Sequence, residues 1–164
     1  MKTHRLTRAA LFTAVMFVTT MLIVIPIPGT QGYVNASDSI AFLAAAFLPP
    51  GYAAAASGIG AALADMAAGY AIFIPATLVI KGLESFVAAY LFHKYRKFPL
   101  FLFLSASLLM PLGYFLFETA LFGMPTALAA VLPNIGQGVF GAVLAWLLLP
   151  LSRKLAEFFP EKKD

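Results

Sequence analysis

A lysine and a glutamate lie three residues apart in the middle of a long apolar segment. Lys81 and Glu84 belong to the run of residues 73–92, and a spacing of three places both side chains on one face of a helix. A bare charge near the centre of a membrane costs at least ~2.5–3.5 kcal/mol, so such groups face the protein interior and find partners there. The two residues either neutralise each other in an internal salt bridge or belong to a site that binds a polar molecule.

Other polar residues in apolar segments favour a binding site. Asp38 stands at the start of one segment, Asp65 near the end of another, and Glu118 near the end of a third. If successive segments cross in alternate directions, these groups all fall in the outer half of the molecule, where one water-filled cavity would collect them. The candidate substrate-binding residues are Tyr33, Asn35, Asp38, Asp65, Tyr70, Lys81, Glu84, Glu118, Asn134 and Gln137.

The chemistry of this set points to a small organic ligand. Carboxylates accept hydrogen bonds from amino and hydroxyl groups, and aromatic rings stack on flat heterocycles. With four carboxylates against one ammonium group, we expect a neutral or cationic heteroaromatic molecule rather than a polyanion. Purely structural roles are the alternative for some members: Asp38 as a helix N-cap, Asp65 as the cap of a loop, and Tyr33 and Tyr70 as part of an aromatic belt at the membrane surface.

The composition shows that a membrane protein must hold these residues. Of the 164 residues, 62% are hydrophobic and only 11% are charged, whereas soluble domains contain about 25% charged residues. The net charge of +4 is too small and too scattered for a nucleic-acid surface. The chain has no Cys, which excludes disulfides and thiolate chemistry.

Apolar runs that approach the length of a membrane span, separated by Pro, Gly and polar residues, predict an all-α polytopic membrane protein with one domain and six transmembrane helices. The predicted helices are 6–25, 38–48, 51–68, 73–92, 100–122 and 126–149, followed by a charged cytoplasmic tail at 152–164. All Lys and Arg residues except Lys81 fall on one side of this arrangement. Because cytoplasmic loops carry the excess of basic residues, both termini are predicted to be cytoplasmic.

The sequence offers little for catalysis. Residues 136–141 match the G-x-G-x-x-G dinucleotide pattern, but they lie in an apolar helix and not after a strand. No phosphate-binding loop occurs, and neither His4 nor His93 is placed for metal ligation or for a triad with the acids. We therefore predict no enzyme activity, no cofactor and no metal. A stand-alone carrier or channel is an alternative, but it would require a relay of ionisable groups across the membrane.

Ala10 and Ala14 offer a stripe of small side chains on which another helix can pack. Together with residues 32–38 (GYVNASD), 58–65 (GIGAALAD) and 75–84 (PATLVIKGLE), this stripe makes the chain resemble the substrate-binding S component of energy-coupling factor (ECF) vitamin transporters. The resemblance covers nearly the whole chain, and it is closest to the branch associated with hydroxymethylpyrimidine and pyridoxine-like vitamins.

The resemblance implies a division of labour in a bacterial cell membrane. An S component captures a vitamin or vitamin precursor outside the cell and then associates with one transmembrane T subunit and two ABC ATPases. Ala10 and Ala14 would contact the T subunit, and residues 27–37 would form a lid over the ligand. Riboflavin or a queuosine precursor is the alternative ligand within the same family.

Overall fold

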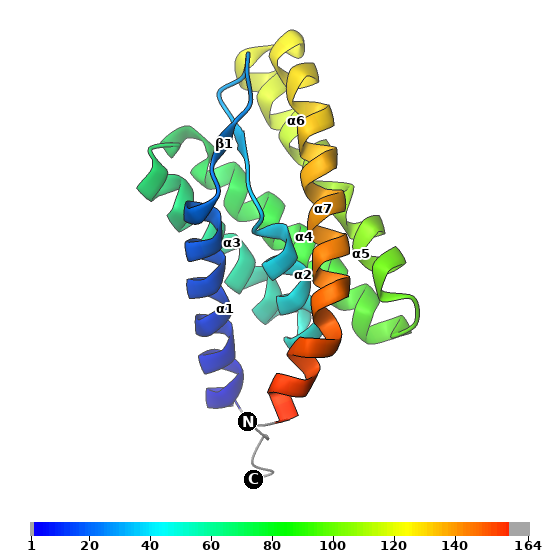
Figure 1. Ribbon diagram of the computed structural model, residues 1–164. Coiled ribbons are helices and arrows are strands. Elements are labelled where there is room, and N and C mark those ends of the chain that lie inside the picture. The colour runs from blue at the N-terminus through cyan, green and yellow to red at the C-terminus, as the bar shows by residue number, and fades with distance from the viewer. Residues whose placement is uncertain (1, 158–164) are drawn as a thin grey trace.

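The computed structural model describes residues 2–157, which are almost entirely helical (Figure 1). The elements are α1 (Lys2–Leu22), β1 (Ile25–Pro26), β2 (Tyr33–Val34), α2 (Asp38–Phe47), α3 (Pro50–Ala68), the 3-10 helix η1 (Ala71–Phe73), α4 (Ile74–Tyr95), α5 (Pro99–Ser107), α6 (Leu109–Phe122) and α7 (Met124–Glu157). The start of α1 and the end of α7 lie at one end of the molecule, and the hairpin of β1 and β2 extends toward the other end.

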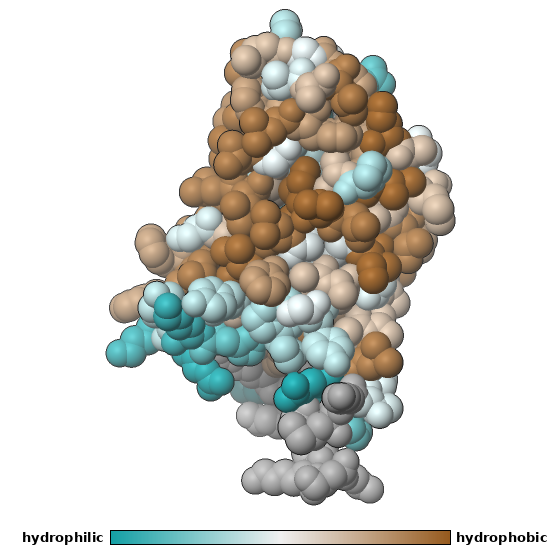
Figure 2. All heavy atoms as spheres, turned by 180° about the vertical axis from the view of Figure 1, so that it is seen from behind, coloured by the Kyte–Doolittle hydropathy of each residue, from teal (hydrophilic) through white to brown (hydrophobic). Residues whose placement is uncertain are grey.

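Four helical segments of the described residues are long and apolar enough to cross a membrane. They are Thr3–Leu22, Ala71–Tyr95, Pro99–Phe122 and Met124–Ser152. By contrast, α2 has ten residues and rises only ~15 Å, while α3 has 19 residues, most of them Ala and Gly. Figure 2 shows a broad hydrophobic surface above a band of hydrophilic side chains at the end that carries the termini. Such an apolar surface suits lipid rather than water.

Several helix boundaries differ from the sequence-based prediction. The predicted helix 100–122 is divided into α5 and α6 at Leu108, because Pro111 has no N–H to donate to the carbonyl of Ser107. The first helix begins at Lys2 and ends at Leu22 rather than spanning 6–25. The last helix extends beyond 149 through Pro150 to Glu157, so it includes the start of the predicted tail. Residues 158–164 of that tail lie outside the described residues.

The segment between α1 and α2 forms a short antiparallel hairpin that the sequence does not predict. Ile25 pairs with Val34, and Pro26 pairs with Tyr33. At its tip, the N–H of Ile27 donates to the carbonyl of Gly32 over 3.1 Å. The hairpin therefore satisfies its own backbone groups and returns the chain to the helices, where β2 leads into α2.

Small residues of α3 allow α1 and α4 to pack closely against its two sides. A Cβ placed on Gly58 would lie 2.5 Å from the backbone oxygen of Leu78 in α4, and one on Gly60 would lie 2.7 Å from the backbone oxygen of Thr13 in α1. Because no side chain fits in either place, glycine at these positions sets the distance between the helices. This packing places Asp65 of α3 beside α4.

The short helix α2 lies inside the bundle, where it contacts α1, α3, α4 and α7. Its fully buried Phe42 stacks on Phe103 with ring centroids 5.2 Å apart, and Phe103 stacks on Phe92 at 5.7 Å. These rings belong to the apolar core that fills the half of the molecule nearer the termini. The polar start of α2, at Asp38, faces the other half.

Candidate functional site

A cavity lies between the hairpin, five α-helices and the 3-10 helix η1, in the half of the molecule away from the termini. The empty space between its walls, open solvent included, is about 460 Å³. The hairpin, α1, α3, η1, α4, α6 and α7 all contribute to its wall. The lining residues are Thr20, Ile27, Gly32, Tyr33, Asn35, Ala61, Asp65, Phe73, Thr77, Lys81, Tyr114, Glu118, Asn134 and Gln137.

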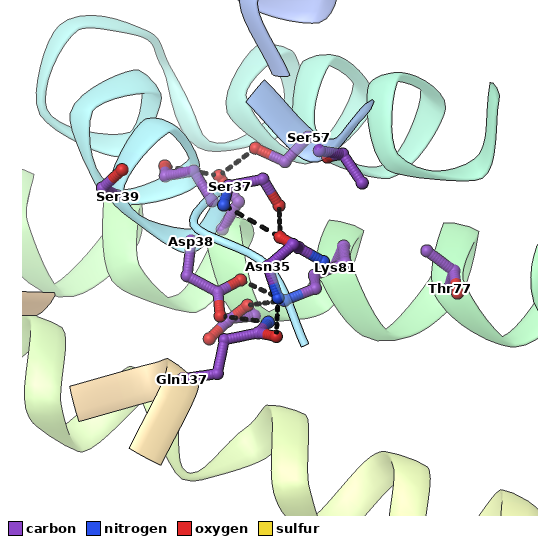
Figure 3. Close-up of polar contacts among 12 residues, drawn as sticks. Asn35, Ser37, Asp38, Ser39, Ser57, Thr77, Lys81 and Gln137 are labelled. Atoms are coloured by element: carbon purple, nitrogen blue, oxygen red, sulfur yellow. Dashed lines mark hydrogen bonds and ion pairs between the residues drawn. The ribbon is translucent and has the colours of Figure 1, made fainter. Parts of the chain in front are cut away.

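Lys81 is the centre of a buried polar network at the base of this cavity (Figure 3). Its ammonium group forms an ion pair with Oδ1 of Asp38 and lies 3.7 Å from Oε2 of Glu84. Lys81 is 2% exposed, and neither carboxylate is exposed at all. The salt bridge within α4 that the spacing suggests is therefore the longer of two contacts, and the closer partner comes from α2.

Gln137 of α7 connects this network to the hairpin side of the cavity. Its Nε2 donates to Oδ2 of Asp38 over 2.7 Å, and its Oε1 accepts from the backbone N–H of Asn35 at the same distance. The side-chain oxygen of Asn35 in turn accepts from the N–H of Ser37 (2.8 Å) and from its hydroxyl (2.5 Å). One amide thus joins α7, the first turn of α2 and the residues that follow β2.

A tyrosine and an aspartate form a second polar group on the wall. The hydroxyl of Tyr33 donates to Oδ1 of Asp65 over 2.6 Å, and its ring lies 4.5 Å from that of Tyr70, centroid to centroid. Burial, together with the hydrogen bond to Asp65, raises the pKa of Tyr33 well above its ordinary value. The phenol is therefore held as a neutral hydrogen-bond donor.

Several carboxylate oxygens near the cavity accept no hydrogen bond from the described residues. Within the described residues, Oδ2 of Asp65, Oε2 of Glu118 and both oxygens of Glu84 are buried without a hydrogen bond. Asp65 and Glu118 line the cavity and are only 3% and 2% exposed. An unsatisfied buried acceptor costs about 1–3 kcal/mol, so a ligand that donates hydrogen bonds to these atoms would gain from them.

Aromatic side chains supply the apolar part of the wall. Phe73 lies 5.5 Å from Phe117 and 6.3 Å from Tyr114, centroid to centroid, and the hydroxyl of Tyr114 shares a hydrogen bond of 2.9 Å with Thr77. Edge and tilted ring contacts of this kind can also receive a flat heterocycle. The cavity thus combines hydrogen-bond acceptors with ring faces.

The structure brings most of the predicted site residues together. Those that line the cavity are Tyr33, Asn35, Asp65, Lys81, Glu118, Asn134 and Gln137. Asp38 and Glu84 lie beneath it and support Lys81, while Tyr70 stacks on Tyr33. The interpretation of Asp38 as a helix N-cap is wrong, because Ser37 occupies that position and Asp38 is the first residue of α2.

Sequence reasoning missed Thr20, Thr77 and Tyr114. Two of them carried a signal, since Thr77 precedes Lys81 by four residues and Tyr114 precedes Glu118 by four, which places each pair on one helix face. Thr20 is buried, and its hydroxyl donates to the carbonyl of Met16 in its own helix. Nothing in its local sequence distinguishes it from Thr19, so only the packing of α1 identifies it.

Comparison with known proteins shows the family of this chain. Residues 1–154 match the family model described as the S component of an ECF-type riboflavin transporter. The thiamine precursor transporter HmpT of Lactococcus lactis subsp. cremoris is 34% identical over 148 residues, covering 90% of this chain and 86% of that protein. A protein of Pyrococcus woesei, described only as an uncharacterized protein in gap 3'region, is 36% identical over 129 residues, covering 77% of this chain and 86% of its own.

Solved structures show the same fold. The S component of a bacterial ECF transporter superposes with a TM-score of 0.73 at 20% identity, covering 98% of this chain and all of the other. The S component for biotin from an ECF-type ABC transporter gives a TM-score of 0.66 at 17% identity, covering 93% and 92%. The matched family and fold are those of integral membrane transport components rather than enzymes.

Proposed function

Since the chain belongs to the family of ECF-type transporter S components, we propose that it captures a small vitamin precursor from outside the cell for ATP-driven import. The ligand that we favour is hydroxymethylpyrimidine or a pyridoxine-like heteroaromatic molecule. It would bind in the cavity between the hairpin and the helices, with Lys81 and its two acids at the base and Tyr33 and Asp65 on the wall.

The observation that carries this proposal is the pair of unpartnered acceptors on the cavity wall. Lys81 already faces two carboxylates, Asp38 and Glu84, and no other Lys or Arg stands among the described residues that line the cavity, so an acidic ligand would find no unpaired cation among them. Asp65 and Glu118 each keep one buried oxygen without a donor. An amino group on a flat ring donates two hydrogen bonds, and the ring itself would lie against Phe73.

The relatives suggest two different ligands. The HmpT relative is named for a thiamine precursor, and the family model for riboflavin. We favour the thiamine precursor because an aminopyrimidine carries N–H donors, which the unpaired oxygens of Asp65 and Glu118 on the cavity wall would accept. The ring system of riboflavin has a single N–H and otherwise presents acceptors, which Asp65 and Glu118 would repel.

A stand-alone carrier or channel is the second candidate, and the packing argues against it. Between the cavity and the end that carries the termini lie the stacked rings of Phe42, Phe92 and Phe103, all of them buried. A relay of ionisable groups would need polar partners in this half. A component that binds the ligand at one face and leaves transfer to a partner module fits the packing better.

We further propose six membrane crossings, with α2 and α3 as the two short ones and both termini in the cytoplasm. The basic residues at the end of α4 and those in α1 border the same hollow at one end of the molecule, as the positive-inside rule requires. The cavity would then open outward. Ala10 and Ala14 are exposed on α1 and would meet the T subunit of a module with two ABC ATPases.

The proposal is tested by calorimetric titration of the purified protein with hydroxymethylpyrimidine, pyridoxine and riboflavin. We expect hydroxymethylpyrimidine to bind most tightly. Asp65→Asn and Glu118→Gln should each weaken its binding by about 1.5–3 kcal/mol, or roughly 10–150-fold, which is the value of a hydrogen bond to a charged group. Ser105→Ala, on the exposed face of α5, is the matched control and should change nothing.

Two outcomes would contradict parts of the proposal. Tighter binding of riboflavin would show that the proposed ligand is wrong and would leave the proposed capture function unchanged. Failure of all three ligands, together with no small molecule released from freshly purified protein on denaturation, would remove the capture function itself.

A further inference from the structure

The side-chain amide of Asn134 has no hydrogen-bond partner among the residues that the structure describes. It lines the ligand cavity from α7 and is only 5% exposed. Each of the other uncharged polar side chains in the described lining is hydrogen-bonded within the protein: Thr20, Tyr33, Asn35, Thr77, Tyr114 and Gln137. Within that lining, Asn134 is therefore the residue whose whole amide remains available to a ligand.

Gln137 fixes the face of α7 on which Asn134 lies. The two residues are three positions apart, so they share one face of the helix, and Asn134 lies ~4.5 Å nearer its start. The amide of Gln137 is held by Oδ2 of Asp38 and by the N–H of Asn35, each over 2.7 Å (Figure 3). A Cβ on Gly141 would lie 2.5 Å from that of Asp38, so α7 packs directly on the start of α2. Asn134 thus faces the cavity one turn away from the buried network.

A primary amide carries a hydrogen-bond acceptor and donors side by side. A flat ring that has an amino group next to a ring nitrogen presents the matching pair, a donor beside an acceptor. Asn binds this kind of edge on adenine with two hydrogen bonds. An aminopyrimidine has such an edge, whereas the ring nitrogen of pyridoxine has no amino group beside it. The amide of Asn134 can therefore make two hydrogen bonds to the first ligand and only one to the ring nitrogen of the second.

We propose that Asn134 makes the site specific for rings in which an amino group stands next to a ring nitrogen. This inference rests on the proposed capture function, and it selects the aminopyrimidine over the pyridoxine-like ligand. The amide oxygen accepts one hydrogen of the amino group, and the amide nitrogen donates to the ring nitrogen. The second hydrogen of the amino group remains for an unpaired oxygen of Asp65 or Glu118.

The missing partner of Asn134 also predicts how the ligand-free protein responds to its replacement. A buried polar group without a partner destabilises the folded state. Asn134→Leu replaces the amide with an apolar side chain of similar size, so the thermal midpoint of the ligand-free protein in detergent should stay the same or rise. An amide that supported the fold would give the opposite result, because its replacement would leave its partners unpaired.

The test is calorimetric titration of the purified full chain with hydroxymethylpyrimidine and with the analogue that lacks its amino group. Asn134→Leu should weaken the binding of hydroxymethylpyrimidine about thirtyfold and that of the analogue about fivefold. The variant removes two hydrogen bonds from the first ligand and one from the second, and each bond is worth a factor of about five. Gln31→Leu, which removes an exposed amide from the hairpin, is the matched control and should change neither affinity.

Three outcomes would overturn the inference. If the unchanged protein binds hydroxymethylpyrimidine but Asn134→Leu loses the same factor for both ligands, or loses nothing, the amide does not recognise the amino group, and only this inference fails. A lower thermal midpoint of ligand-free Asn134→Leu would show that the amide holds α7 in place. Failure of the unchanged protein to bind hydroxymethylpyrimidine would overturn the inference together with the proposed ligand.

Discussion

Lys81 joins two carboxylates that lie in different helices. Its partner Asp38 is 43 positions away in the chain, and its partner Glu84 is one helical turn away. All three side chains are at most 2% exposed, so their charges are compensated within the protein and not by water. Replacing one of the three residues leaves a buried charge without a partner. This costs more free energy of folding than replacing the whole ion pair with apolar residues.

Lys81→Met should therefore destabilise the protein by about 3–5 kcal/mol, the usual cost of breaking a buried ion pair. Thermal unfolding in detergent can be followed by the fluorescence of Trp146, the single Trp. Lys97→Met, on an exposed residue beyond the same helix, should change stability by less than about 0.5 kcal/mol. Equal stability of the two variants would mean that Lys81 is not needed to neutralise Asp38 and Glu84.

At the scale of the element, the hairpin is held to the bundle by few polar contacts. Gln137 supplies one, through the N–H of Asn35, and Tyr33 supplies another, through Asp65. A segment fixed by a small number of hydrogen bonds opens at low free-energy cost. This is the property that a cover over a ligand cavity requires.

Gln137→Ala should loosen the residues that follow β2 without unfolding the helices. The loss of one or two hydrogen bonds, worth about 1 kcal/mol each, should speed amide hydrogen exchange in residues 33–37 roughly 5–30-fold. Gln31→Ala, an exposed residue in the same hairpin, should leave the exchange rates unchanged. If the two variants exchange alike, the amide of Gln137 does not hold the hairpin.

The close packing of α3 against α4 predicts how a single methyl group added to α3 changes stability. Gly58→Ala would place a Cβ 2.5 Å from the backbone oxygen of Leu78, and backbone cannot move aside cheaply, so we expect a loss of about 1–3 kcal/mol. Gly136→Ala, in α7 with nothing within 4 Å, should gain up to about 1 kcal/mol from helix propensity. Thermal midpoints that shift in the same direction would contradict this account of the α3–α4 contact.

How far the sequence predicts each element depends on whether its signal is local. Apolar runs bounded by Pro and Gly place most helices within a few residues, and the embedded acids correctly mark one half of the molecule as polar. The hairpin is missed because each strand has only two residues, too few for an alternating pattern. The pairing of Lys81 with Asp38 is missed because it depends on how α2 packs against α4, which spacing along one helix does not contain.

At the scale of the whole molecule, polar groups gather at one end, and at the other an apolar core lies beneath a basic surface. The stacked rings of Phe42 and Phe103 belong to this apolar core. Among the residues that the structure describes, this apolar core interrupts the polar groups between the ligand cavity and the end that carries the termini. The family implies a partner module that completes the transfer of the ligand, and α1 presents an exposed face on which a partner could pack.

Ala10→Trp and Ala14→Trp test that face. Both alanines are exposed on α1, so the larger side chain should fit without disturbing the fold, and vitamin affinity measured by titration should stay within about twofold. Uptake of the radiolabelled vitamin by cells that also express the T subunit and the ATPases should be lost, because close helix packing needs small residues. Leu11→Trp, the neighbouring residue at 63% exposure, places the same ring on another face of the helix and should keep uptake. Loss of vitamin binding in the alanine variants would instead show that Ala10 and Ala14 support the fold of the chain itself. Loss of uptake in Leu11→Trp would show that the contact with the T subunit is not confined to the small-residue stripe.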